Sequence, residues 1–476
     1  MNMKNIALFS ALAAVFCAHA ENQISETTEA PSQGVDFAES QSPFKFNAGA
    51  DLRIRQEIMH NVATLPYGVL GRPGVYRGKT KNQLRFRPDV WMELKAGDNW
   101  RFYTRITDEF RYGVVQRTKN QEWPCEAVID NLYLEGLGLF DDLVDFRIGR
   151  QDLYRMYGLN HIFVDGTPGD GSCTTYADIA RMAFHVDEES WLDLFALWTH
   201  DQEELRLGSK RSRRISKTGY GRGEREMDDW GFGTIWNSKL DFIDYQLFWI
   251  QKNTAAYHRD GVKYARRQTN LIGTKLVPRW TNEFSTPIEL MAQIGKNGDG
   301  DTLHAWATYV GTSWKQSEEA EKSWRPFWDT GVLILSGDKN AANEDGGHSA
   351  WDPMWYRGID DSEMFLYGSL YGCAWWSNMI NLKTQFGVDF GYRHKVQFSL
   401  SSMWAEEKDG LGGGDGYYKG FISQVRYDFP LWIADKSSGG RFELFGHVLA
   451  ELFNPGDYYE TDKPAFFVRW QIDLKF

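Results

Sequence analysis

The sequence predicts an antiparallel β-barrel of about 18 strands that spans an outer membrane. Three observations predict it. Apolar and polar side chains alternate by twos from residue 44 to the end, the connections between these stretches alternate in length, and the last stretch ends the chain at Phe476. Aromatic residues are abundant, with 20 Trp, 22 Tyr and 30 Phe, whereas Pro is scarce at 14. Long aromatic strands joined by glycine turns would give that balance.

The first 43 residues are expected to lie outside the barrel. Lys4 and the apolar stretch that ends at Ala18-His19-Ala20 have the pattern of a secretory signal peptide, residues 1–20. Residues 21–43 are polar and weakly patterned, and we interpret them as a flexible leader. Because no later run of 18 apolar residues predicts a transmembrane helix, residues 44–476 are expected to cross the outer membrane as strands after Sec-dependent export.

Eighteen stretches carry the alternation, and an even number is typical of bacterial outer-membrane barrels. In the first, Phe46, Leu52 and Ile54 share one face and Arg53 and Arg55 share the other. Most are as long as the roughly 9–11 residues that a tilted strand needs to cross a bilayer. The stretches are 44–57, 82–95, 100–112, 127–139, 143–151, 178–187, 190–200, 229–238, 240–253, 269–278, 285–296, 302–314, 324–336, 379–393, 395–406, 417–429, 441–453 and 465–476.

The connections carry a second pattern. Counted from the first, the odd-numbered connections are mostly long, whereas the even-numbered ones are mostly short, such as "AGDN" at 96–99 and "FDD" at 140–142. Short periplasmic turns and long extracellular loops are typical of outer-membrane barrels. A soluble sandwich or propeller, the other class that would explain the aromatic residues, has no reason to alternate in this way.

The cost of burying charge in lipid indicates which face points inward. An Arg at the bilayer midplane costs about 2–4 kcal/mol on the outer face of a barrel. Four such residues, Arg85, Arg87, Arg101 and Arg105, would cost on the order of 10 kcal/mol, comparable to the stability of a whole domain. These side chains are therefore expected to face a water-filled lumen, where charged groups determine ion selectivity.

Three short motifs resemble the alginate-export family of outer-membrane proteins. "DFRIGRQDLYRMYG", with Gly149-Arg150-Gln151, resembles the family's Gly-Arg-Gln motif. "HAWATYVG" and "RPFWDTGVLILSGDKN" resemble its strand followed by a Ser-Gly-Asp loop start, here Ser336-Gly337-Asp338. "AWDPMWYRG" resembles its Phe-Asp-x-Leu-Phe-Pro segment, from which Trp351-Asp352-Pro353 departs. The resemblance covers nearly the whole mature chain and implies an 18-stranded barrel that passes alginate through an arginine-rich pore.

The candidate pore lining is a set of arginines on predicted inward faces. One interpretation is a cationic constriction that binds sugar carboxylates through bidentate guanidinium contacts. The alternative is a structural ladder, in which inward acids such as Asp89 and Glu93 neutralise the arginines. Strict alternation points Arg150 at lipid, so either a bulge at Gly149 turns it inward, which we favour, or it lies above the membrane edge. The set is Arg53, Arg55, Arg85, Arg87, Arg101, Arg105, Arg147, Arg150 and Arg469.

The connection 337–378 is long for an unstructured loop, which predicts a folded or constricting role. It carries Trp351, Asp352, Trp355 and Tyr356, whose rings are of the type that stacks on sugars. The alternative is that these rings pack against the barrel mouth.

Two further features of the loops leave alternatives open. In "KNGDGDT", Asp299 and Asp301 have the composition of a calcium loop but lack the EF-hand spacing, so a plain turn is the main interpretation and no cofactor is expected. Cys125 and Cys173 either pair or remain free thiols.

The sequence therefore predicts a passive channel for an anionic polysaccharide or its oligosaccharides, with a general or small-solute anion-selective porin as the alternative. The expected partners are outer-membrane lipids, the anionic polysaccharide, the barrel-assembly machinery and a periplasmic secretion scaffold. The net charge of −12 argues against a nucleic-acid partner. Catalysis is not expected, because the ten histidines are scattered and none lies in a Gly-x-Ser-x-Gly or His-Glu-x-x-His motif.

Overall fold

The computed structural model describes most of the predicted barrel. The described residues are 43–62, 80–115, 127–153, 156–163, 176–199, 229–259, 262–264, 266–297, 301–317, 324–339, 348–355, 362, 377–391, 393–408, 413–433 and 442–476. The predicted signal peptide, nearly all of the leader, Cys125, Cys173, Asp299 and Tyr356 lie outside these residues.

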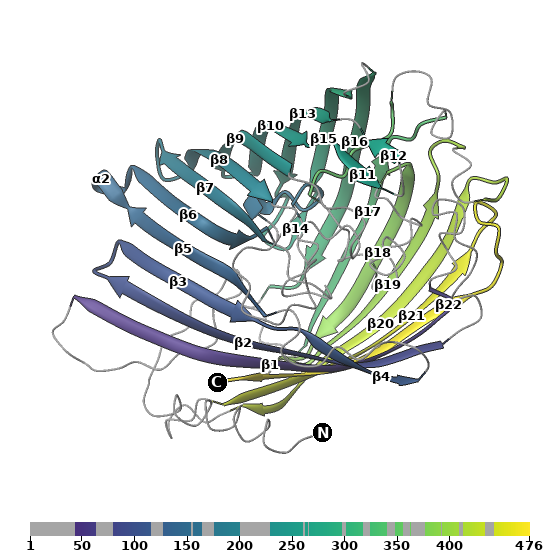
Figure 1. Cartoon of the computed structure of the whole chain (residues 1–476), viewed down its shortest axis with the longest axis horizontal. Helices are drawn as coiled ribbons and strands as arrows, with labels where there is room; N and C mark the ends of the chain where they lie inside the picture. The colour runs from purple at the N-terminus through teal and green to yellow at the C-terminus, as the bar shows by residue number, and fades with distance from the viewer. Residues whose placement is uncertain are drawn as a thin grey trace.

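The described strands form one closed antiparallel barrel of 18 strands (Figure 1), two of which are each divided into two labelled segments. They are β1 (Phe44–His60), β2 (Thr80–Ala96), β3 (Trp100–Thr107), β4 (Phe110–Val115), β5 (Val128–Gly138), β6 (Val144–Asp152), β7 (Tyr176–His185), β8 (Ser190–Thr199), β9 (Asp229–Leu240), β10 (Ile243–Thr254), β13 (Arg267–Pro278), β14 (Phe284–Ser285), β15 (Ile288–Asn297), β16 (Thr302–Lys315), β17 (Arg325–Leu335), β18 (Met379–Asp389), β19 (Lys395–Trp404), β20 (Tyr418–Ile433), β21 (Glu443–Pro455) and β22 (Ala465–Lys475).

Two of the barrel strands are interrupted. β3 and β4 both pair with β2, at Asp89–Ala96 and Asn82–Phe86 respectively, so they are two parts of the predicted strand 100–112. β14 and β15 both pair with β16 and together match the predicted strand 285–296. With these two joined, every predicted strand coincides with an observed one, and the predicted fold class is confirmed.

The last strand closes the barrel against the first. β22 pairs antiparallel with β1 from Asp51 opposite Lys475 to His60 opposite Phe466. It also pairs with β21 along its whole length. Closure leaves no strand edge with unpaired backbone groups, which hydrocarbon would not satisfy.

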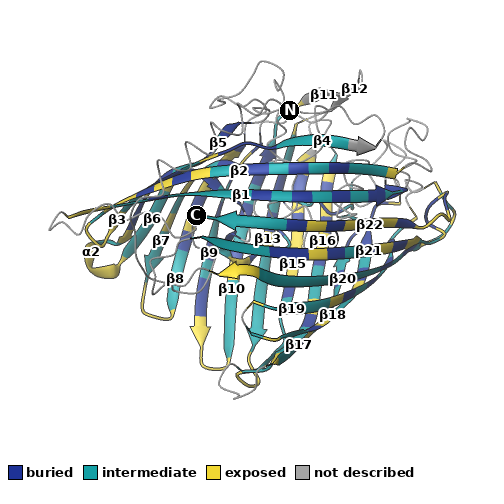
Figure 2. Cartoon of the chain, turned by 90° about the horizontal axis from the view of Figure 1, so that it is seen from below, coloured by how far each residue is buried: buried dark blue, intermediate teal, exposed yellow. Residues whose placement is uncertain are grey.

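The two faces of the wall differ as the alternation predicts. On β22, Val468 is 42% exposed and its neighbours Phe467 and Arg469 are buried. The same alternation of buried and exposed residues runs along many of the strands in Figure 2. Because Val468, Phe466 and Trp470 project from the outside of a closed barrel, they form part of an apolar outer surface.

The short connections lie together at one end of the barrel. They include residues 97–99, the four-residue helix α2 (Leu139–Asp142), residues 186–189 and residues 241–242. No helix among the described residues is long and apolar enough to cross a membrane. At the other end, the described parts of the long connections include a small hairpin of β11 (Tyr257–Arg259) and β12 (Val262–Tyr264).

One side of the barrel interior is filled by two segments from long connections, 156–163 and 348–355. Their side chains, including Phe163 and Trp355, share a buried apolar cluster with inward residues of the wall such as Ile235, Ile250 and Leu271. Since these segments pack on β7 to β10, β13 and β15, the charged wall of β1 to β6 lies on the other side of the interior.

Candidate channel lining

A network of buried ion pairs begins at the centre of the charged wall. Arg85 lies on β2 between Glu57 of β1 and Glu109, which lies in the break between β3 and β4: its guanidinium donates to Glu57 at 3.0 Å and to Glu109 at 2.8 Å. Arg55 lies 2.9 Å from Glu57, and Arg53 lies 3.7 Å from Glu109. All five side chains are buried. These pairs form because residues that alternate onto the same face of neighbouring strands stand side by side.

The network continues along β2, β3 and β5. Arg105 donates to Asp130 at 2.7 Å and to Asp152 at 3.1 Å. Arg87 lies 3.8 Å from Asp130 and 3.6 Å from Asp89. A register shift between Arg105 and Ile106 in the β3–β5 pairing places an extra residue, Asp130, in reach of both arginines.

The third part of the network lies nearer the short turns. Arg101 forms ion pairs with Glu93 and Glu135, and Arg147 donates to Glu135 at 2.7 Å. The Arg147 guanidinium also lies over the ring of Tyr133, 4.6 Å from its centroid. Cation–π contacts and charge-assisted hydrogen bonds together hold these guanidinium groups in defined orientations.

In this third part, the arginine side chains are more exposed to solvent than the carboxylates with which they pair. The side chain of Arg101 is 22% exposed and that of Arg147 is 26% exposed, whereas the Glu93 and Glu135 side chains are 5% and 6% exposed. Arg105 is likewise more exposed than Asp130, although Asp152 remains accessible. The wall therefore presents guanidinium groups to the lumen and keeps most of their carboxylates beneath them.

Arg469 on β22 is placed differently. Its guanidinium Nε donates to Nε2 of His447 at 3.0 Å, which requires the imidazole to accept at that nitrogen. Both residues are buried.

Arg150 does not follow the expected bulge. The register of β6 shows no inserted residue: Arg150 lies opposite Leu132 and Asp178, in the outward row of Ile148. The inward turn that we favoured at Gly149 is therefore wrong. The guanidinium is buried at the end of the strand, 3.1 Å from Asp178. Gly149 has a positive φ of 125°, and a Cβ there would lie 2.2 Å from the carbonyl oxygen of Leu132, so both observations favour glycine at this position.

The structure thus separates the predicted arginines into two groups. Arg53, Arg55, Arg85, Arg87, Arg150 and Arg469 are buried, so they do not line open water as expected. The physical reason is that neighbouring acids pair with most of them and packing covers them. Arg101, Arg105 and Arg147 are the members that solvent reaches. The structural-ladder alternative describes the first group, and the pore-lining role remains a prediction for the second.

Segment 348–355 is held on the inner wall by Asp352. Its backbone N–H donates to Gln293 at 2.8 Å, and the Gln293 amide donates back to its carbonyl at 2.7 Å. Its carboxylate accepts from Arg267 at 3.2 Å and lies 3.6 Å from Lys252. Burial acts to raise the pKa of Asp352, but Lys252, then Arg267 and the N–H of Met354, outweigh it and lower this pKa to about 2.

The tryptophans of this segment are buried rather than open to solvent. Trp351 is 2% exposed. Trp355 stacks on Phe163 with ring centroids 5.5 Å apart, and it also covers Gly231, where a Cβ would lie 2.6 Å from its ring. Packing, the alternative to sugar stacking, describes both rings in this structure.

Segment 156–163, which supports the tryptophans, begins with the last three residues of the "DFRIGRQDLYRMYG" motif, but nothing in that motif predicted this role. The side chains of Gln246 and Lys275 donate to the carbonyls of Tyr157 and Gly158, at 2.9 and 2.5 Å. His161 lies 2.6 Å from Glu289. No local pattern indicates these contacts, because each joins residues some ninety or more positions apart in the chain.

The Ser336-Gly337-Asp338 motif anchors the start of the long loop. Ser336 accepts from the backbone of Trp306 and donates to the carbonyl of Ser349 at 2.7 Å. Asp301, one half of the calcium candidate, lies 3.7 Å from His348. Among the described residues, no three His, Cys, Asp or Glu side chains are grouped to hold a metal ion.

Comparison with solved structures gives the fold. The Pseudomonas aeruginosa protein OpdQ superposes with a TM-score of 0.51 at 9% identity, over 90% of this chain and 97% of that one. P. aeruginosa OccK11 (OpdR) and Acinetobacter baumannii OccAB2 each give 0.50, at 10% and 9% identity, over 90% of this chain and 96% and 98% of theirs. The chain has the fold of the outer-membrane porins.

No family model and no curated protein matches the sequence. The comparisons therefore establish the architecture and leave the resemblance to the alginate-export family without support from a family match.

Proposed function

We propose that the chain is a passive outer-membrane channel for anionic solutes. The outer surface carries large exposed apolar residues such as Val90, Leu247 and Val468 on a closed barrel, as contact with lipid requires. The inner face carries the charged network. An apolar outside and a charged inside are the arrangement of a channel wall, and transport through it involves no chemical step.

The solvent exposure of the arginine side chains is the observation that supports a preference for anions. Arg101 and Arg147 are each several times more exposed than the Glu135 carboxylate that lies between them. Because a guanidinium that solvent reaches acts on a passing ion more strongly than a carboxylate beneath it, the lumen should attract negative charge.

The interior favours small anions and short oligosaccharides over a moving polymer. Segments 156–163 and 348–355 occupy one side of the barrel and hold to the wall through Asp352, Gln293 and Glu289. This observation supports the small-solute anion-selective porin over a channel for a long chain such as alginate. A polymer channel would require these segments to leave the lumen.

Single-channel recording in planar bilayers tests the proposal. In a KCl gradient, the reversal potential should show that chloride is preferred, and the double variant Arg101→Gln/Arg147→Gln should move it toward potassium. Arg393→Gln, which removes an exposed charge at a short turn outside the network, is the matched control and should leave it unchanged. A potassium-selective native channel would refute the anion preference. If polyuronate blocked the current at the same concentration as a single uronate, counted in uronate units, the result would support a polymer channel instead.

A further inference from the structure

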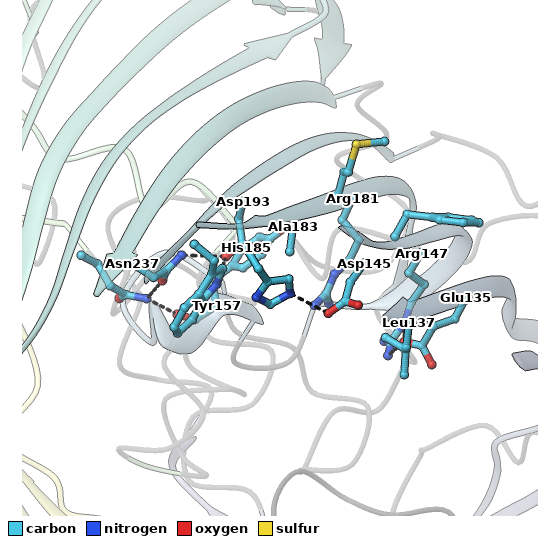
Figure 3. Close-up of a pocket in the computed structure, with 14 residues that line it drawn as sticks. Glu135, Leu137, Asp145, Arg147, Tyr157, Arg181, Ala183, His185, Asp193 and Asn237 are labelled. Atoms are coloured by element: carbon cyan, nitrogen blue, oxygen red, sulfur yellow. Dashed lines mark hydrogen bonds and ion pairs between the residues drawn. The ribbon is translucent and has the colours of Figure 1, made fainter. Parts of the chain in front are cut away.

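A pocket of about 300 Å³ lies in the inner wall near the short turns (Figure 3). Its lining comes from β5 to β10 and from Tyr157 of segment 156–163. The charged side chains at its wall include Arg147, Arg181, Asp145 and Asp193. Ligand pockets in proteins are typically 300 Å³ or larger, so this one has room for a single small molecule.

Each acid of the pocket already has partners. Asp145 accepts from the backbone N–H of Gly138 at 2.7 Å and lies 3.0 Å from His185. Asp193 accepts from the indole N–H of Trp191 at 2.9 Å and from the amide of Asn237 at 2.8 Å.

The third acid, Glu135, is engaged by Arg147 and Arg101 as described above. The carboxylates are thereby stabilised without the help of a bound cation.

Arg181 is the charged group of the pocket to which the described residues supply no ion-pair partner. It lies on β7 opposite Arg147 and Phe195. Its guanidinium is 5.2 Å from the centroid of the Tyr157 ring. Within the part of the chain that the structure describes, it forms neither an ion pair nor a hydrogen bond. A guanidinium has five N–H donors in a planar fork that matches a carboxylate.

Two polar atoms of uncharged side chains in the pocket likewise have no hydrogen-bond partner among the described residues. The hydroxyl of Tyr157 and the amide oxygen of Gln246 are buried and make no hydrogen bond to the described residues. The amide nitrogen of Gln246 is used, since it donates to Asn237 at 2.7 Å. Buried polar atoms without partners are costly, so a ligand that supplies hydroxyl groups would stabilise them.

We propose that this pocket binds a small carboxylate that carries hydroxyl groups, such as a sugar acid. Its carboxylate pairs with Arg181, and its hydroxyl groups meet Tyr157, Gln246 and the oxygens of Asp193. The ring of Trp191 adds an apolar wall to the pocket. This proposal rests on the anion channel proposed above and gives it a binding site at the end with the short turns, beside Arg147 and Glu135 of the ion-pair network.

The experiment uses three sugars of one ring size that differ in charge: D-glucuronate, D-glucose and D-glucosamine. Each is added to either side of single channels in planar bilayers, and the interruptions of the ion current give an apparent Kd. Glucuronate should bind most tightly, and from the side of the short turns. Arg181→Gln should weaken its binding at least about tenfold, the factor expected for loss of a charged hydrogen-bonding partner. The exposed Arg393→Gln variant is the matched control and should leave it unchanged.

A second variant covers the case in which Arg181→Gln does not assemble. Ala183 lines the pocket, and Ala183→Leu should fill it and weaken glucuronate binding while the ion selectivity stays native. Glucuronate binding that is unaffected by these variants, or glucosamine that binds as tightly as glucuronate, would overturn the pocket. A channel that keeps its chloride preference in that case leaves the proposed function intact, whereas a potassium-selective channel means that the proposed function itself has failed.

Discussion

Individual arginines on the charged wall have different roles, depending on how far each side chain is buried. Arg85 is buried between Glu57 and Glu109, so its contribution is to hold β1, β2 and the break between β3 and β4 together. Arg101 makes similar pairs but is partly open to the lumen. Buried ion pairs are costly to break because the remaining charge has no water, whereas exposed ones contribute little to stability.

Arg85→Met should therefore destabilise the barrel much more than Arg101→Met. Removing Arg85 leaves buried carboxylates with fewer donors, and we expect a loss of about 3 kcal/mol in the free energy of unfolding. The more exposed Arg101 should cost about 1 kcal/mol or less. Urea titration in lipid vesicles, followed by tryptophan fluorescence, measures both. Equal losses would mean that burial does not distinguish the two positions.

At the scale of elements, the in-folded segment 348–355 is held by its buried tryptophans and by the hydrogen bonds and ion pairs of Asp352. The carboxylate of Asp352 faces Lys252 and Arg267, and its backbone is bound on both sides to Gln293. Because this buried carboxylate lies between two cations, the position of the segment should respond to the charge of Asp352.

Acid should release this segment. The pKa of Asp352 is about 2 in the folded barrel, below its ordinary 3.8, so the carboxylate contributes fully above pH of about 4. That contribution is lost as the pH falls from about 4 through about 2, and conductance should rise over this range. Asp352→Asn should show the higher conductance at neutral pH and a smaller acid response. An identical pH profile in the variant would show that Asp352 is not the group that releases the segment. The native channel and the variant share all their other acids, so a difference between them reports on Asp352 alone.

β6 depends on a glycine for a close approach of two backbones. Gly149→Ala should prevent or strongly weaken assembly, because the new Cβ would meet the Leu132 carbonyl at 2.2 Å in a backbone conformation that disfavours side chains. Gly97→Ala is the matched control: φ is also positive, but nothing lies within 4 Å of the new Cβ, so about 1 kcal/mol is expected. Heat-modifiable mobility on detergent gels reports the folded fraction of each. Normal assembly of Gly149→Ala would show that the strand can shift.

At the scale of the whole molecule, the barrel sorts apolar groups outward and charges inward. Val468 lies between Ile58 of β1 and Ala450 of β21, well inside the span of β22. Leu240 projects at the end of β9, beside a short turn. The two positions are therefore expected to lie at different distances from the midplane of the bilayer.

A charge on the outer surface should cost more at the middle of the barrel than at its end. Val468→Arg should lower the free energy of unfolding by about 2–4 kcal/mol, and Leu240→Arg by about 0–1 kcal/mol. Urea titration in lipid vesicles measures the difference. Equal costs would place Val468 away from the hydrocarbon midplane.

Much of the architecture was predictable from residue patterns. The strand 465–476 was identified from Phe466, Val468 and Trp470 on one face and Arg469 and Gln471 on the other, and both the closure against β1 and the two faces are confirmed. The candidate site was predictable in part. The alternation placed Arg101 and Arg147 on the inner wall, but it did not indicate that Arg55 and Arg85 are covered, nor that Arg150 remains in the outward row.

The sequence by itself determined the barrel, because side-chain direction in a strand has a period of two and lipid penalises any charge on the wrong face. The tertiary structure alone decided which inward charges meet solvent and which are neutralised. Asp352 meets Lys252 across 100 positions of the chain, and Arg181 meets Tyr157 from a different element. Such contacts depend on how loops fold into a closed wall, and no local alternation records that packing.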